Sequence, residues 1–221
     1  MSLYLAEIVE ALKRQWPDNR TVNIVCHGHS VPAGYFATPV VDTFSAYPHL
    51  LHRGLKERFP FAVVNVIVTA VGGEASLAGA GRFEREVLCH RPDVVTLDYG
   101  LNDRAIGLAA AEAAWRAMID QSLARAIKVL LLTPTPDASA IGSGPADDWA
   151  ALQQHAAQIR ALAREYRVGL VDSLRAFAAY LPPAGDLTSV LSWPNHPNRT
   201  GHALVAAELL RYFPIAFPSN L

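Results

Sequence analysis

The sequence has few cysteines, few charges and no long apolar run, and each shortage excludes a class of protein. Only Cys26 and Cys89 are cysteines among 221 residues, so no disulfide framework is indicated, and isolated cysteines usually lie buried as small hydrophobic side chains. Charged residues make up 18% of the chain and the net charge is -1, so nothing indicates a nucleic acid or an anionic membrane as a partner. No stretch approaches the roughly 18 uncharged apolar residues of a membrane span.

Hydrophobic residues, by contrast, are plentiful, at 51% of the chain. A chain of this length and composition buries most of its apolar surface, and we expect a single domain over residues 1–221. In residues 1–17 apolar side chains recur at helical spacing with charged residues between them. This segment is predicted to be an N-terminal surface helix and not a signal peptide, so the expected location is the cytoplasm.

Strand-like and helix-like segments alternate along the rest of the chain. β-branched apolar runs predict five strands. The first begins at Thr21, and the other four span residues 61–69, 93–99, 126–133 and 168–172. Apolar residues at helical spacing predict helices at residues 43–59, 75–90, 108–125, 149–166 and 173–180, and Thr200 is expected to help to cap a last helix that ends near Tyr212. This alternation predicts an α/β fold, a three-layer αβα sandwich around a five-stranded, mostly parallel sheet.

Polar residues follow the first three predicted strands. Ser30 ends the run CHGHS after the first strand, Gly73 lies in the turn VGGE after the second, and Asn102 lies in GLND after the third. Right-handed crossovers place the carboxyl ends of parallel strands at one edge of the sheet. We therefore expect these three residues to meet there.

These residue types match what acyl transfer requires, namely a nucleophile, a base and donors for the oxyanion. Ser30 is the predicted nucleophile. Its own backbone N–H, the backbone N–H of Gly73 and the side-chain amide of Asn102 are the predicted oxyanion donors. His196, in the segment SWPNHPN before the last helix, is the predicted base.

The four segments carry a family resemblance. GHS, VGGE, GLND and HPN, in this order, resemble the four blocks of the SGNH hydrolases, also called the GDSL esterase and lipase superfamily. The resemblance covers about residues 21–212. It implies a flavodoxin-like fold and hydrolysis of a carboxylic ester or thioester through an acyl-enzyme on Ser30, with no cofactor and no metal ion. Family members act on acetylated sugars, aryl esters, lysophospholipids and acyl thioesters, so a small-molecule ester is expected but not specified.

Two residues depart from the family pattern. His29 stands where the first block has an aspartate that supports the turn. Trp193 stands three residues before His196, where the last block usually has the aspartate that orients the histidine, and loss of such a carboxylate can cost about 10⁴ in rate. Some family members use a backbone carbonyl at this place. We therefore predict that the main-chain carbonyl of Trp193 accepts the Nδ1–H of His196, with Asp186 as the other candidate.

Other interpretations of these segments were weighed against the serine hydrolase. His27 and His29 have the spacing of two metal ligands on one face of a strand, but no third ligand is evident, so packing and turn support are favoured. An acyltransferase would pass the acyl group to a sugar or alcohol, and an inactive binding module would keep the fold alone. The α/β-hydrolase motif GxSxG is not matched, because Pro32 replaces its second glycine.

Overall fold

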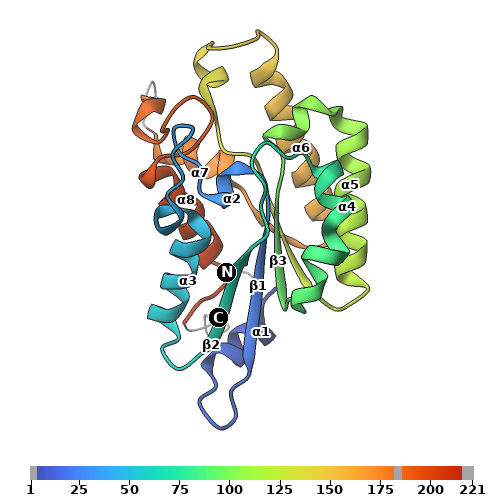
Figure 1. Cartoon of the computed structure of the whole chain (residues 1–221), viewed down its shortest axis with the longest axis vertical. Coiled ribbons are helices and arrows are strands. Elements are labelled where there is room, and N and C mark those ends of the chain that lie inside the picture. The colour runs from blue at the N-terminus through green and yellow to red at the C-terminus, as the bar shows by residue number, and fades with distance from the viewer. Residues whose placement is uncertain (1–3, 182–185, 216–221) are drawn as a thin grey trace, which may run out of the picture.

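The computed structural model describes residues 4–181 and 186–215, and its centre is a sheet of five parallel strands (Figure 1). In the order in which they lie side by side, the strands are β2 (Val63–Val68), β1 (Thr21–Gly28), β3 (Val94–Asp98), β4 (Lys128–Leu132) and β5 (Gly169–Val171). Each neighbouring pair runs parallel. The predicted αβα sandwich is thus confirmed, with a sheet that is parallel throughout.

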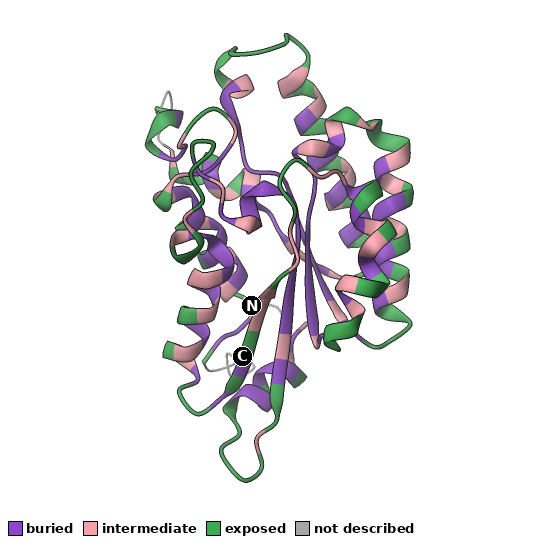
Figure 2. Cartoon of the chain, viewed as in Figure 1, coloured by how far each residue is buried: buried purple, intermediate pink, exposed green. Residues whose placement is uncertain are grey.

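Helices cover both faces of this sheet. One face packs against α1 (Ala6–Lys13), α3 (Tyr47–Arg58), α7 (Ser173–Tyr180) and α8 (Arg199–Leu210). The other face packs against α4 (Ser76–Glu86), α5 (Gly107–Leu123) and much of α6 (Asp148–Tyr166). The strands β1, β3 and β4 are mostly buried between the two layers, whereas the edge strand β2 is largely exposed or intermediate, as Figure 2 shows. No helix in the described ranges is long and apolar enough to cross a membrane.

Several predicted boundaries and roles are corrected by local backbone geometry. The predicted helix 43–59 is divided into η1 (Thr43–Ser45) and α3, because Ala46 is extended (φ -73°, ψ 149°). The predicted helix 75–90 is shorter in the structure, where it is α4 and ends at Glu86. The short turn η2 (Leu88–His90) follows it, and Cys89 in this turn is exposed and not buried as expected. Helix α8 is capped by Asn198 and not by Thr200, since the Asn198 side chain accepts the N–H of Gly201.

The order of the strands brings the turns of the site together. Strand β1 pairs with β2 on one side and with β3 on the other, and Gly28 at its end lies opposite Asp98. A Cβ on Gly28 would collide with the carbonyl oxygen of Asp98, so glycine is needed where these strands approach. The turns after β1, β2 and β3 are therefore neighbours at the carboxyl edge.

Candidate active site

Ser30 and His196 meet at the carboxyl edge of the sheet. Ser30 begins the short helix α2 (Ser30–Ala33) directly after β1, and His196 comes from the loop before α8. The Oγ of Ser30 lies 2.8 Å from the Nε2 of His196 although 166 residues separate them in the chain. Both residues are buried. This distance is that of a hydrogen-bonded nucleophile and base.

The second ring nitrogen of His196 does not have the predicted partner. Within the ranges that the structure describes, Nδ1 of His196 makes no hydrogen bond, so the predicted bond to the Trp193 carbonyl is absent and that prediction is wrong. Trp193 adopts a left-handed conformation (φ 82°), which the sequence pattern does not reveal. The carboxylate of Asp186 is not bonded to His196 either, because it accepts the N–H and the hydroxyl of Thr188.

The surroundings of His196 keep its imidazole neutral. Burial lowers the pKa of His196 and the nearby His29 lowers it further, while the main-chain carbonyl of Phe36 raises it. The ring of Tyr35 stacks on the imidazole with the centroids 6.0 Å apart. A neutral imidazole is the form that accepts a proton from a serine hydroxyl.

The acid limb of kcat/KM for ester hydrolysis should therefore have its midpoint below pH 6.5. The rate requires deprotonated His196, and a pKa lowered from 6.5 moves the acid limb of kcat/KM to lower pH. The measurement is kcat/KM for p-nitrophenyl acetate between about pH 4 and pH 8. An acid-limb midpoint at or above 6.5, the ordinary histidine value, would contradict the lowered pKa.

Acid unfolding has to be measured alongside this profile. His27 and His202 are buried, and burial lowers their pKa values to about 4 and about 3. In the unfolded chain both histidines bind a proton more readily than in the folded protein. Their contribution to the free energy of unfolding is therefore present above about pH 6.5 and is lost as the pH falls toward their pKa values in the folded protein. Circular dichroism over the same pH range separates loss of fold from protonation of His196.

The predicted oxyanion donors lie on two adjoining turns. Gly73 has φ +77°, a conformation that favours glycine, and nothing lies within 4 Å of the position of a Cβ. Asn102 begins the short turn η3 (Asn102–Ala105), and its Nδ2 donates to the carbonyl of Glu74 at 3.0 Å. Since an amide nitrogen carries two hydrogens, one of them remains for a ligand. Asn102 thus connects its own turn to that of Gly73.

A buried carboxylate, Glu74, holds the Gly73 turn. Its side chain accepts hydrogen bonds from the Nε of Arg82 at 2.9 Å and from the hydroxyl of Tyr99 at 2.8 Å. The Tyr99 hydroxyl also lies 3.0 Å from Nε2 of His27, whose Nδ1 is 2.9 Å from the hydroxyl of Thr69. His27 therefore packs at the end of β1 as predicted, and its polar partners there were not predicted. The roles of Glu74, Arg82 and Tyr99 were not predicted, and the only signal was the glutamate in VGGE.

A second buried carboxylate, Asp103, holds the Asn102 turn. It accepts the backbone N–H of Ser76 and the indole Nε1–H of Trp115, each at 2.7 Å. Asp103 thus accepts a backbone N–H at the start of α4 and an indole N–H of α5. Burial raises the pKa of Asp103, while the hydrogen bonds from Trp115 and Ser76 lower it. Both turns that carry candidate donors are therefore anchored to α4 and α5.

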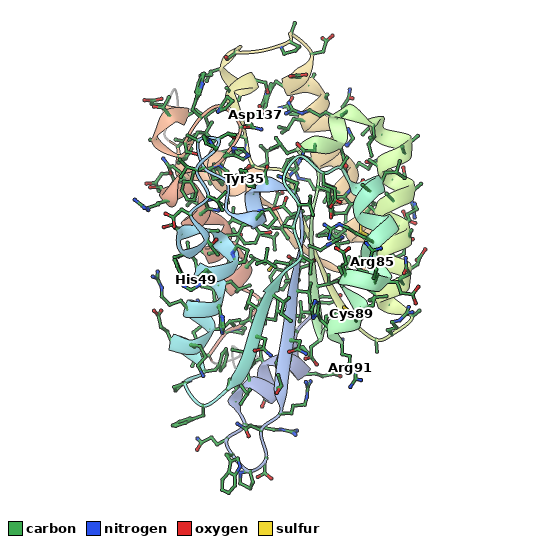
Figure 3. All side chains as sticks on the ribbon, viewed as in Figure 1. Tyr35, His49, Arg85, Cys89, Arg91 and Asp137 are labelled. Carbon is green, nitrogen blue, oxygen red and sulfur yellow. The ribbon has the colours of Figure 1, made fainter. Side chains whose placement is uncertain are left out.

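The segment 135–147 lies over this edge of the sheet and contains the short turn η4 (Ala138–Ile141). Asp137 at its base accepts a hydrogen bond from Arg104 at 2.6 Å, and the N–H of Ala138 donates to the carbonyl of Pro194. Figure 3 shows Asp137 and Tyr35 beyond the carboxyl ends of the strands. The segment thus contacts both η3 and the loop of His196.

His29 supports the turn as predicted, because its Nδ1 accepts the backbone N–H of Val31 and caps α2. The alternative of a metal site on His27 and His29 is not supported. In the described part of the chain, no group of three or more His, Cys, Asp or Glu residues is placed to hold a metal ion.

Comparison with protein families decides the family. The model of the GDSL-like Lipase/Acylhydrolase family matches residues 26–204, which is well over half of the chain. The chain belongs to this family. The family member is therefore a hydrolase that acts on ester bonds, and the resemblance of its four sequence blocks is confirmed. No curated protein matches the chain.

Several solved structures share the fold of this protein. The acetylxylan esterase Axe2 from Geobacillus stearothermophilus is 21% identical with a TM-score of 0.71, over 89% of this chain and 94% of that one. A putative GDSL-like lipase from Parabacteroides merdae is 17% identical with a TM-score of 0.75, over 88% of this chain and 96% of that one. Catalytic mutants of Axe2 replace a serine, a histidine and an aspartate. In the chain described here, no carboxylate is bonded to His196 within the described ranges.

Proposed function

We propose that this protein is a serine esterase that hydrolyses a carboxylic ester through an acyl intermediate on Ser30. The observation that carries the proposal is the 2.8 Å contact between Oγ of Ser30 and Nε2 of His196. His196 takes the hydroxyl proton while Oγ forms a bond to the carbonyl carbon. The charge on the carbonyl oxygen is received by the N–H groups of Ser30 and Gly73 and by the Asn102 amide.

His196 then gives its proton to the leaving alcohol as the ester bond breaks. Water attacks the acyl group on Ser30 in the same manner and releases the acid. Water is the proposed acceptor because the family is one of acylhydrolases. An acyltransferase is not favoured by the comparisons.

We propose a short acyl group, such as acetyl. The fold shared with an acetylxylan esterase is consistent with a small acyl group.

The purified protein should react with a fluorophosphonate probe at Ser30 and hydrolyse p-nitrophenyl acetate. With a short acyl site, kcat/KM for the acetate ester should exceed that for the octanoate ester by about tenfold or more. Peptide mapping by mass spectrometry identifies the labelled residue. Absence of both labelling and hydrolysis would identify an inactive binding module, and faster hydrolysis of the octanoate ester would exclude the short acyl site.

A further inference from the structure

We propose that His29 is a second catalytic histidine at Ser30 and that the carboxylate of Asp98 supports it. The inference rests on the proposed serine esterase function and deepens it by assigning a second base to the same hydroxyl. It also gives a role to the residue that departs from the family pattern in the first block.

The hydroxyl of Ser30 lies between two imidazoles. Nδ1 of His29 is 3.3 Å from Oγ of Ser30, and Nε2 of His196 approaches the same oxygen to 2.8 Å. Both rings are buried, with His29 at 1% exposure and His196 at 4%. Either ring therefore lies within reach of the hydroxyl proton and is shielded from bulk water.

The surroundings of His29 define its tautomer. The backbone N–H of Val31 points at Nδ1 of His29 at 3.3 Å. Since a backbone N–H can only donate, Nδ1 carries the lone pair and the hydrogen of the neutral ring is on Nε2. The lone pair that accepts from Val31 is also the one that lies beside the Ser30 hydroxyl.

Asp98 lies on the other side of the His29 ring. Its Oδ1 is 3.5 Å from Nε2 of His29, an electrostatic contact between two buried side chains. Its Oδ2 accepts the hydroxyl of Tyr47 at 3.2 Å, and its main-chain carbonyl accepts the N–H of His29 at 3.2 Å. The order Ser30, His29, Asp98 is that of serine, histidine and carboxylate, with a 3.5 Å contact in place of a hydrogen bond between Nε2 and Oδ1. Within the described ranges, no carboxylate is bonded to His196.

When Ser30 attacks, the Oγ–H bond breaks and its proton moves to Nδ1 of His29, while the new bond between Oγ and the carbonyl carbon moves an electron pair onto the carbonyl oxygen. The imidazolium then faces the Asp98 carboxylate through Nε2–H. As the carbon–oxygen bond to the leaving alcohol breaks, Nδ1 returns the proton to that alcohol.

His29 is placed less favourably than His196 to take the proton. Protonation of Nδ1 removes the acceptor of the Val31 N–H, and the distance to Oγ is 3.3 Å for His29 against 2.8 Å for His196. The contribution of His29 should therefore be clearest when His196 is absent.

A double-mutant cycle tests this assignment with His29→Asn, His196→Ala and the double variant. The asparagine oxygen can still accept the Val31 N–H and cap α2, but the amide is not a base. We expect His29→Asn alone to lower kcat for p-nitrophenyl acetate about tenfold with little change in KM. His196→Ala should keep a fluorophosphonate labelling rate at Ser30 that the double variant loses by a further tenfold or more.

Asp98→Asn tests whether the carboxylate of Asp98 supports His29. In the His196→Ala background it should lower the labelling rate as His29→Asn does, because the neutral amide no longer stabilises the imidazolium but still accepts from Tyr47. If His29→Asn fails to fold, as judged by circular dichroism, His29→Ser takes its place in the cycle, since serine also caps a helix and is not a base.

The outcomes separate this inference from the proposed function. If the wild type is labelled but the double variant reacts as fast as His196→Ala, His29 is only a helix cap and the inference is overturned while the esterase proposal stands. A wild type that is neither labelled nor able to hydrolyse the ester overturns the proposed function and the role of His29 with it.

Discussion

Replacing Ser30 by alanine should lower kcat for p-nitrophenyl acetate by about 10⁵ to 10⁶. Removal of the nucleophile ends acyl-enzyme formation, and the oxyanion donors together with substrate binding leave only a residual rate over water of about 10³ to 10⁴. Both imidazoles that flank the hydroxyl lose their proton donor at the same time. This change is therefore expected to exceed the loss caused by removing either histidine.

Ser173→Ala is the matched control for this variant. Ser173 is also a buried serine at the start of a helix, at 1% exposure, and within the described ranges its hydroxyl makes no hydrogen bond. Its removal should leave kcat and fluorophosphonate labelling unchanged. If Ser30→Ala kept a rate within about tenfold of the wild type, a nucleophile other than Ser30 would have to be sought.

Asn102→Ala should lower kcat by about 10² to 10³ with little effect on KM, because an oxyanion donor acts mainly on the transition state. The proposed donor is the side-chain amide, and one of its hydrogens is donated to the Glu74 carbonyl at 3.0 Å. The measurement is the steady-state kinetics of p-nitrophenyl acetate hydrolysis, compared between the variant and the wild type.

Asn102→Asp separates the charge of this donor from its shape. Aspartate has nearly the same size, but it has no N–H and places a negative charge near the oxyanion, so the loss in kcat should be at least as large as for alanine. Thermal unfolding of both variants measures the cost of the lost bond to Glu74, about 1 kcal/mol. Unchanged kcat in both variants would remove Asn102 from the oxyanion site.

Local sequence patterns account for most of the architecture. The apolar run from Thr21 and the run in residues 93–99 become the buried strands β1 and β3, because β-branched residues between two helical layers fit the centre of a parallel sheet. The glycine and polar residues after these strands predict turns at the carboxyl edge. From these turns follow the position of Ser30 at the carboxyl edge and the resemblance to the family.

The partners of the site residues depend on packing that no local pattern encodes. Trp193 stands at the family position for the aspartate, yet within the described ranges Nδ1 of His196 makes no hydrogen bond to it or to any other residue. Likewise, Asp98 lies 3.5 Å from His29 only because β3 pairs with β1 in the register that sets Gly28 opposite Asp98. Propensity and periodicity act over a few neighbouring residues, so they determine the strands and turns of this protein. The distances between side chains on different turns are fixed by strand register and by the packing of α4 and α5, and only the tertiary structure decides them.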